Sequence, residues 1–537
     1  MRRLTRPASA SNRGSLLADI VLINPRFEVS FWGFEHAMAV FGKRANVPVA
    51  CLPLLAALTP PEHTITIMDE NVAPIDFERC AKADIVGVTG MIVQRFRMTE
   101  ILTELKRLGK FTVVGGPWVT VKEDYFGSLA DVIVIGEAEE TWPRFLNEWK
   151  EGRHALRYEQ AERTDMSRVP VPRFDLLDTR KYVFGSLQFS RGCPFQCEFC
   201  DIIVTFGRRP RVKTPGQVIA ELEAIRAAGM NIVFVVDDNL IGNKRAIKEV
   251  LREVVAWQQK HGYPLTLFTE ASLDLADDPE LMALMAACNF VAVFVGIESP
   301  SEESLRETKK FQNVRKGGGT MIEKVQRIQD AGMVVWCGMI VGFDSDDRTI
   351  FDRQIEFIQQ ARIPLVMAGM LTAIPKTPLY DRLAKAGRLD PADTPEFGTN
   401  VRPLKMSGAE LRDGYLRVLS ALYEPEAFFE RIEAVYLRKK FELGYGKTRY
   451  WARRPIGRLA TESVLLAGAL AMFAGLMLKV RPASLRREYR RRFWRLLKFH
   501  RRPGMLIGYL LYMAAHYHLR TMAEQMRTGE ARLVNTM

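Results

Sequence analysis

The chain has 537 residues, which is room for about three domains and for large buried cores. Hydrophobic residues make up 47% and charged residues 26% of the chain, so disordered, collagen-like and small disulfide-scaffold classes are excluded. There are 76 Lys and Arg against 63 Asp and Glu, a net charge of +13. A basic balance of this kind favours nucleic acid or an anionic membrane surface as a partner.

Strands alternate with helical patterns over residues 18–150, after a polar segment at 1–17 that we expect to be a flexible arm. Short apolar runs predict five strands, at 20–25, 64–68, 83–89, 111–114 and 132–135. The alternation predicts a doubly wound parallel sheet, in which ligands bind beyond the carboxyl ends of the strands. Ordinary turns are the alternative interpretation of these ends. The candidate ligand-binding residues there are Asp69, Glu70, Asn71, Thr89, Gly90, Met91, Gly115, Gly116, Gly136 and Glu137.

A second alternation of strands and helices follows a polar linker at 151–182. About six strand–helix units over 183–380 favour a (βα)₆ partial TIM barrel, although the pattern alone does not separate it from a second open sheet. The pattern then becomes helical, with a C-terminal domain at 381–455 and a basic, apolar tail at 456–537. The predicted fold class is therefore α/β with a helical C-terminal region.

Three of the seven cysteines are crowded together, at Cys193, Cys197 and Cys200. So few cysteines in so long a chain do not make a disulfide framework, and no secretory signal is evident, which indicates a reducing, cytoplasmic setting. Thiolates are the ligands of iron–sulfur clusters, and three of them leave one iron of a [4Fe–4S] cluster open to another ligand. Zinc is the rival, but a structural zinc site prefers four ligands and no His lies nearby.

The spacing C-x₃-C-x₂-C, with an aromatic residue before the last Cys and a predicted barrel after it, resembles the radical S-adenosylmethionine (SAM) enzymes. The resemblance implies that SAM chelates the open iron and that an electron donor such as flavodoxin or ferredoxin drives its cleavage to a 5′-deoxyadenosyl radical. A Gly-Gly-Glu-like segment usual in that family is replaced here by Asp237-Asp238-Asn239. For Glu270, Ser272 and Glu298 the alternative interpretation is a helix N-cap or an acidic residue in the first turn of a helix. The implied SAM-binding residues are Phe199, Asp237, Asp238, Glu270, Ser272 and Glu298.

Residues 18–150 resemble the cobalamin-binding domain that precedes many radical SAM enzymes. The resemblance is carried by the strand-end segments named above, and it implies that they bind cobalamin. The D-x-H-x-x-G motif that supplies a histidine to cobalt is absent, so Met91 or Trp118 near the cobalt is a hypothesis, with core packing as its alternative. Residues 374–425 resemble the C-terminal region of a subset that includes the hopanoid C-2 methylases.

The two implied cofactors together predict methylation of an unactivated carbon in a lipid-like or other secondary-metabolite substrate. SAM donates its methyl group by polar attack only to a nucleophile, and a C–H bond is not one. A radical can remove that hydrogen, and methylcobalamin can then donate the methyl group. No catalytic base is identified. A radical oxidative cyclase is the alternative within this class, and a non-catalytic cobalamin-dependent sensor is the alternative from another, against which the cysteine triplet argues.

The net charge is concentrated in residues 481–502, which hold ten basic residues and one acidic residue. Helical spacing places apolar side chains on one face of this segment, at Leu485, Tyr489, Phe493, Leu496 and Leu497, as in a helix that binds anionic headgroups. The flanking apolar runs, 464–478 and 504–515, are shorter than the roughly 18–20 residues of a spanning helix. We expect residues 455–537 to attach peripherally to the inner face of a membrane; a solvated helix and nucleic acid are the less favoured alternatives.

Overall fold

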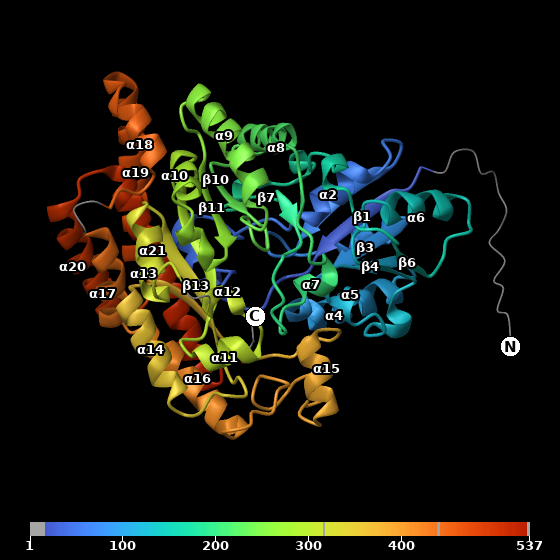
Figure 1. Cartoon of the computed structure of the whole chain (residues 1–537). Coiled ribbons are helices and arrows are strands. Elements are labelled where there is room, and N and C mark those ends of the chain that lie inside the picture. Colours follow the sequence, from blue (N-terminus) through green and yellow to red (C-terminus); the bar gives the residue numbers. More distant parts are fainter. Residues whose placement is uncertain (1–16, 315–316, 438–440, 534–537) are drawn as a thin grey trace.

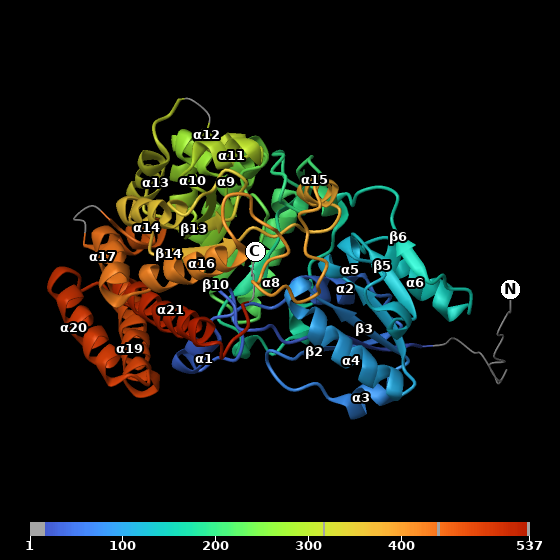
Figure 2. The same ribbon diagram turned by 90° about the horizontal axis from the view of Figure 1, so that it is seen from below.

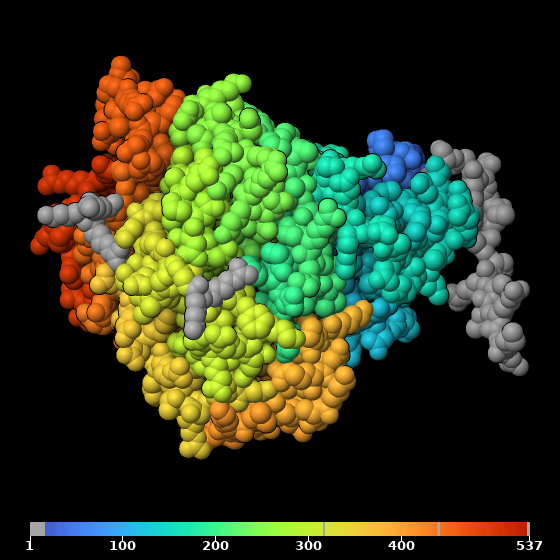
Figure 3. Space-filling model, in the orientation of Figure 1, coloured from blue at the N-terminus to red at the C-terminus, as the bar shows by residue number. Residues whose placement is uncertain are grey.

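The computed structural model describes residues 17–314, 317–437 and 441–533, so nearly all of the expected N-terminal arm lies outside the described residues. Figure 1 shows three parts: an N-terminal α/β domain, a central sheet with its helices, and a group of C-terminal helices on the far side of that sheet. In the space-filling view of Figure 3 these parts form one continuous body.

The N-terminal domain is a parallel sheet with the strand order β2-β1-β3-β4-β5-β6. Its strands are β1 (Asp19–Asn24), β2 (Thr64–Asp69), β3 (Ile85–Thr89), β4 (Phe111–Gly115), β5 (Val132–Ile135) and β6 (Arg157–Glu159). Alternate residues of β1 face opposite layers, because side chains of a strand alternate in direction. Ile20 and Leu22 pack against α2 (Cys51–Leu58) and α6 (Thr141–Lys150). The opposite face is covered by α3 (Phe77–Lys82), α4 (Arg95–Arg107) and α5 (Pro117–Val121).

Strand β6 lies in the segment that the sequence assigns to a linker. It pairs with β5 at the edge of the sheet, and it buries Tyr158, whose hydroxyl donates to Glu148 at 2.5 Å. The strand was missed because it is three residues long and carries a single apolar side chain between two charged ones.

The central sheet is also parallel, with the order β14-β13-β12-β11-β10-β7, and its strands form the predicted partial barrel. Its strands are β7 (Gly185–Leu187), β10 (Ile232–Val235), β11 (Thr266–Ala271), β12 (Phe290–Glu298), β13 (Val334–Val341) and β14 (Leu365–Met370). The crossover helices are α8 (Pro215–Ala227), α9 (Lys244–Lys260), α10 (Pro279–Ala287), α13 (Met321–Asp330) and α14 (Ile350–Ala361). The first strand, β7, ends at Leu187, and Ser190–Arg191 (β8) pairs outside the sheet, antiparallel with Arg211–Val212 (β9).

The open side of the barrel is closed by the two ends of the chain. Helix α1 (Glu35–Phe41), which follows β1, lies beside the last helix α21 (Pro503–Thr528), as Figure 2 shows. His518 of α21 is fully buried and its Nε2 lies 2.7 Å from the Ser30 carbonyl oxygen. Burial lowers the pKa of His518 to about 3, so it is neutral in the folded protein. Trp32 enters the barrel and stacks on Phe234 with ring centroids 5.7 Å apart.

The C-terminal helices are α15 (Pro378–Lys385), α16 (Gly408–Leu422), α17 (Pro425–Tyr436), α18 (Tyr445–Ala452), α19 (Pro455–Lys479), α20 (Ala483–Phe499) and α21. The apolar face of α20, which the sequence predicts to contact lipid, packs inward instead: Tyr489 is fully buried, and Phe493 stacks on Phe473 of α19 at 4.4 Å. Amphipathic spacing shows that one face of a helix is covered but not what covers it.

Helix α19 extends beyond its uncharged run to 25 residues. Among the described residues it is the one helix that is long and apolar enough to cross a membrane, by length and composition. Only 11% of its most apolar stretch is buried in the protein. The expectation that this run is too short to span is therefore corrected, because the helix begins nine residues before the uncharged segment.

Candidate functional site

Cys193, Cys197 and Cys200 lie in the loop between β8 and α7 (Ile202–Thr205). Gly192 opens this loop at a φ of +95°, where a side chain would meet the Arg209 carbonyl oxygen at 2.9 Å, so the turn requires glycine. Burial raises the pKa of Cys193 and of Cys200, and neighbouring thiols contribute to both shifts. The three thiols therefore lie within electrostatic reach of one another in a protected pocket.

Side chains from distant strands and loops contact the cysteine sulfurs. The Asn239 amide lies 3.9 Å from the Cys193 sulfur, and the Gln312 amide lies 3.5 Å from the Cys197 sulfur. Lys310 pairs with Glu298 at 2.8 Å, and although burial opposes the charge, Glu298, Cys197 and Cys200 raise the pKa of Lys310. A buried cation and amide donors are suited to stabilise thiolate ligands.

The cysteine loop fits a cluster better than a single metal ion. In the part of the chain that the structure describes, no three His, Cys, Asp or Glu side chains converge on one metal ion, as a zinc site requires. A [4Fe–4S] cluster does not need such convergence, since each thiolate binds a different iron. These residues would hold three irons and leave the fourth open.

Four carboxylates gather at the carboxyl ends of the neighbouring barrel strands: Asp237 and Asp238 after β10, Glu270 in β11 and Glu298 in β12. Burial, followed by the charges of Asp238, Asp237 and Glu298, raises the pKa of Glu270 to about 8. Burial also raises the pKa of Asp237 to about 7, although it accepts hydrogen bonds from the Phe189 and Ser190 backbone at 2.7 and 2.8 Å. Asp237 thus fixes the strand end that leads into the cysteine loop.

The remaining predicted SAM-binding residues lie around the same end of the barrel. Ser272 is bonded to Asn239 at 3.2 Å, so Asn239 links it to Cys193. Phe199 packs against Phe343 with ring centroids 6.2 Å apart, and Asp238 lies 3.4 Å from the Gly192 nitrogen. The structure brings these positions together with the cysteines, and their SAM contacts stay predictions. Sequence reasoning gave no role to Asn239, although it closes the segment 237–239, and it missed Lys310 and Gln312, which lie in no motif.

We expect Glu270→Gln to remove a pH-dependent penalty on the stability of the apo-protein. A carboxyl group with a raised folded-state pKa binds its proton more tightly when folded. Its contribution to stability is complete below the unfolded-state pKa of 4.5, and it is lost as the pH rises to the folded-state pKa of about 8. Between about pH 5 and pH 8 the free energy of unfolding of the wild type should fall by roughly 1–2 kcal/mol relative to that of the variant. This value includes a reduction for solvent screening in the cavity.

Urea unfolding of both proteins across this pH range measures the difference. Glu303→Gln, at an exposed glutamate, serves as the control and should follow the wild type. Parallel stability profiles for the wild type and Glu270→Gln would contradict the raised pKa.

The strand ends of the N-terminal domain form the other side of the site. The Asp69 carboxylate accepts from the Tyr182 hydroxyl at 2.8 Å, and Glu70 pairs with Arg97. Met91 is half exposed. Trp118 is buried in the core, which agrees with core packing, the alternative to a position near the cobalt.

Glycines shape the turns beside those strand ends. Gly116 has a φ of +101°, and a side chain there would meet the Thr89 hydroxyl at 2.4 Å, so this turn requires glycine beside Gly90 and Gly115. Gly136 also has a positive φ, of +72°. These predicted cobalamin-binding positions lie at one edge of the sheet, because parallel strands end together.

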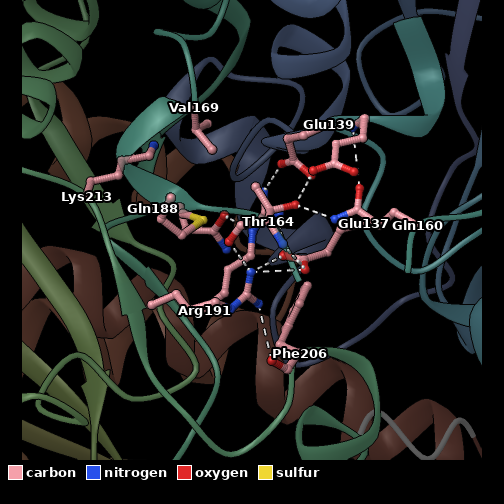
Figure 4. A network of polar contacts seen from close by, with 12 residues as sticks. Glu137, Glu139, Gln160, Thr164, Val169, Gln188, Arg191, Phe206 and Lys213 are labelled. Carbon is pink, nitrogen blue, oxygen red and sulfur yellow. Dashed lines mark hydrogen bonds and ion pairs between the residues drawn. The ribbon is translucent and has the colours of Figure 1, made fainter. Parts of the chain in front are cut away.

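The Glu137 carboxylate is held in a buried network of ion pairs, and its predicted contact with cobalamin stays a prediction. The carboxylate lies 2.9 Å from Arg191 of the barrel and 2.9 Å from Arg211, while Glu139 lies 2.7 Å from Arg191 (Figure 4). The Thr164 nitrogen donates to the same Glu137 carboxylate at 3.0 Å. This buried network joins the N-terminal domain to the residue two positions before Cys193, so only the backbone of Glu137 is left for a ligand at the strand end.

A cavity of about 1550 Å³ connects the two sides of the site with the C-terminal helices. Near the N-terminal domain it is lined by Glu70, Asn71 and Met91, and it then passes Glu270. The wall through the barrel is mainly aromatic, and beyond it the cavity reaches the last helices. The aromatic lining residues include Trp32, Phe184, Phe234, Phe268, Trp336, Trp451 and Tyr512.

Comparison with known proteins places this site in a family. Residues 187–354 match the model of the Radical SAM superfamily, and residues 377–532 match that of a domain of unknown function. Hopanoid C-2 methylase of Rhodopseudomonas palustris is 32% identical over 524 residues, which cover 96% of this chain and 95% of that protein. The chain belongs to the radical SAM superfamily. An uncharacterised methyltransferase of Synechocystis is 40% identical over 429 residues, 78% of each protein. This radical SAM protein is an enzyme of the methyltransferase group.

Two solved structures share its fold. The cobalamin-dependent SAM radical enzyme OxsB, with aqua-cobalamin and SAM bound, covers 96% of this chain and 80% of its own, with a TM-score of 0.58 and 14% identity. The radical SAM methyltransferase TsrM from Kitasatospora setae, with cobalamin and a [4Fe–4S] cluster bound, covers 74% of this chain and 82% of its own, with a TM-score of 0.55 and 19% identity. The cofactors that these matches support are a [4Fe–4S] cluster, SAM and cobalamin.

Proposed function

We propose that this radical SAM enzyme uses cobalamin to methylate an unactivated carbon of an apolar, lipid-like substrate. The observation that carries the proposal is the aromatic cavity, which passes from the strand ends of the N-terminal domain past Glu270 and through the barrel. When bound, the cluster and SAM supply a radical that removes hydrogen from carbon, and cobalamin supplies the methyl group. The names of two relatives, the hopanoid methylase above and a bacteriochlorophyllide d methyltransferase of Chlorobaculum tepidum, support the substrate class.

The cavity walls favour a large apolar body over a small polar one. Phe234 and Phe268 stack at 4.7 Å, and Trp32 covers Phe234 from the other side, which forms a continuous aromatic surface. Aromatic walls bind apolar surface and exclude water, which also protects a radical from side reactions. Cavities for small ligands measure about 300–1,000 Å³. A volume of about 1550 Å³ is therefore larger than one small ligand needs.

The test is anaerobic reconstitution with iron, sulfide and cobalamin, followed by SAM labelled in its methyl group and candidate lipid extracts. We expect one 5′-deoxyadenosine and one S-adenosylhomocysteine for each labelled product, since one SAM gives the radical and another gives the methyl group. Release of 5′-deoxyadenosine without methyl incorporation would instead support a radical oxidative cyclase. No SAM cleavage by the reduced, reconstituted protein would support a non-catalytic sensor.

Narrowing the cavity should separate methylation from SAM cleavage. Ile232 is half-buried and lines the cavity at the start of β10, far from the cysteine loop. Ile232→Trp should lower labelled product at least about tenfold, because a misplaced substrate loses its reactive geometry. Substrate-free SAM cleavage should be unchanged. Leu404→Trp, at an exposed leucine, is the matched control, and equal methylation by Ile232→Trp and wild type would place the substrate elsewhere.

We propose that the enzyme works in the cytoplasm, peripherally at the inner face of the membrane, with a reduced flavodoxin or ferredoxin as electron donor. All seven cysteines are free thiols, which supports a reducing compartment. Recovery of the enzyme in the membrane fraction at low salt and in the cytoplasmic fraction at high salt would support this location. Recovery in a periplasmic fraction would contradict it.

A further inference from the structure

The outer face of α19 is an exposed apolar stripe. Its large side chains recur every three or four residues or at multiples of that spacing, which places them on one face of the helix. They are between 43% and 87% exposed, and they are Ile456, Leu459, Leu466, Leu470 and Leu478, with the exposed Val464 at the edge of this face. The helix of 25 residues is about 37 Å long at 1.5 Å per residue. Proteins that are free in solution rarely leave so long an apolar surface uncovered.

The inner face of α19 is held along the protein. It packs against α21 and α1, and a side chain at Gly475 would meet the Val40 carbonyl oxygen at 2.9 Å. Such close backbone approach fixes the helix lengthwise. Although α19 is long enough to cross a membrane, crossing would require it to leave α1 and α21, so its attached position suits a helix that lies in a bilayer surface.

The exposed face of α20 carries cations beside this stripe. Arg487, Arg490 and Lys498 follow helical spacing with the exposed Trp494 between them. No ion pair joins these three cations to any residue within the described ranges, whereas Arg491, on the same helix, pairs with Glu488 at 2.7 Å. Unpaired cations around an exposed Trp are typical of a surface that meets anionic headgroups. Helices α19 and α20 lie together at the edge of the molecule opposite the N-terminal domain (Figures 1 and 2).

The same helices form a wall of the cavity. Arg458, Thr461 and Leu465, on the inner face of α19, line it. So do two exposed residues, Phe499 at the end of α20 and Arg501 in the short connection before α21. Exposed residues in a cavity wall mark where it opens. The cavity therefore has a mouth beside the apolar stripe, and an apolar molecule could pass from a bilayer into the barrel without crossing water.

We propose that the α19 stripe and the outer face of α20 dock the enzyme onto an anionic lipid bilayer, and that the substrate enters the cavity through the adjoining mouth. The second part rests on the proposed function. A second copy of the chain is the other candidate to cover the stripe. Pairing two copies through this face would bring their unpaired arginines together, whereas a bilayer supplies the opposite charge.

The docking surface is tested by flotation of the reconstituted full-length enzyme with vesicles of phosphatidylcholine, with and without about 30% phosphatidylglycerol as the anionic lipid. The stripe variant is Leu466→Glu with Leu470→Glu, and the charge variant is Arg487→Glu, Arg490→Glu and Lys498→Glu. The controls make the same changes at exposed residues elsewhere: Leu156→Glu with Leu404→Glu, and Arg168→Glu, Arg180→Glu and Arg245→Glu.

We expect wild type and controls to float with anionic vesicles, and the stripe variant to bind at least about tenfold more weakly because apolar burial is lost. The charge variant should lose the preference for anionic over neutral vesicles. Binding of both variants equal to that of the wild type would overturn the proposal. So would light scattering that shows a wild-type dimer and a monomeric stripe variant.

Substrate loading is tested separately from docking. Once a substrate is known, labelled-methyl transfer is measured with that substrate in vesicles and in detergent. The stripe variant should lose methylation in vesicles and keep it in detergent. If the stripe variant methylates the substrate as well as the wild type does in vesicles and in detergent, loading through the mouth is overturned. If the wild type methylates it in neither medium, the proposed function is contradicted, while the flotation result stands.

Discussion

Replacing Cys193, Cys197 or Cys200 with Ala is expected to abolish both the [4Fe–4S] absorbance and SAM cleavage. Each thiolate would bind a different iron, so a missing ligand exposes a second iron and the cluster is no longer held at three points. The loop that carries them is short and fixed by Gly192, and no other described cysteine can take the place of one. Iron and sulfide content, visible absorbance and 5′-deoxyadenosine release measure the effect.

Cys80→Ala is the matched control, because Cys80 is a free thiol on α3, in the core of the N-terminal domain and outside the cysteine loop. It should retain cluster and activity. A Cys197→Ala protein that keeps a full cluster and cleaves SAM would contradict the assignment of the site.

Replacing Arg191 with Met should destabilise the folded protein by about 3–5 kcal/mol, the usual cost of leaving a buried charge without its partner. Arg191 is buried and contacts both Glu137 and Glu139, so its removal leaves Glu139 without its cation, while Glu137 keeps Arg211. Burial opposes ionisation of Glu139, but Arg191 holds its pKa below the usual value. That contribution is present above the unfolded-state pKa and is lost as the pH falls, so the penalty should be larger at about pH 7 than at about pH 4.

Denaturant unfolding of the wild type, Arg191→Met, Glu139→Gln and the double variant forms a thermodynamic cycle for this pair. Arg173→Met removes an exposed arginine whose one ion pair within the described ranges is with Asp175 at the surface, and it should cost less than about 1 kcal/mol. A loss of similar size in both single arginine variants would show that the buried network does not hold the domains together.

The sequence predicts features that are set by residues close together in the chain, such as strands and the cysteine triplet. Apolar runs identify most strands of both sheets, but β6 and β7 are three residues long and each carries a single apolar side chain, so neither has such a run. The cysteine triplet is recognisable because its three ligands lie within eight residues. Asn239 and Gln312 come from separate segments and reach the sulfurs only after folding. No spacing in the sequence marks such contacts.

Two further features of the structure could not be predicted, because a sequence pattern indicates that a residue is buried or lies at a strand end but not which distant residue contacts it. Glu137 occupies a strand end that is typical of a ligand site, yet its carboxylate faces two arginines of the next domain. The apolar residues of α20 do share one face, but α19 and the core cover it. In both cases the missing information is which distant element packs against the residue, and that follows from tertiary structure.

The contact between α1 and α21 has a consequence for biosynthesis. Ser30 and His518, whose ring binds the Ser30 carbonyl, are 488 residues apart in the sequence. Because α21 is made long after the barrel strands, the side of the barrel that it closes stays open until α21 has been synthesised. The cavity that α21 lines is therefore completed only at this late step.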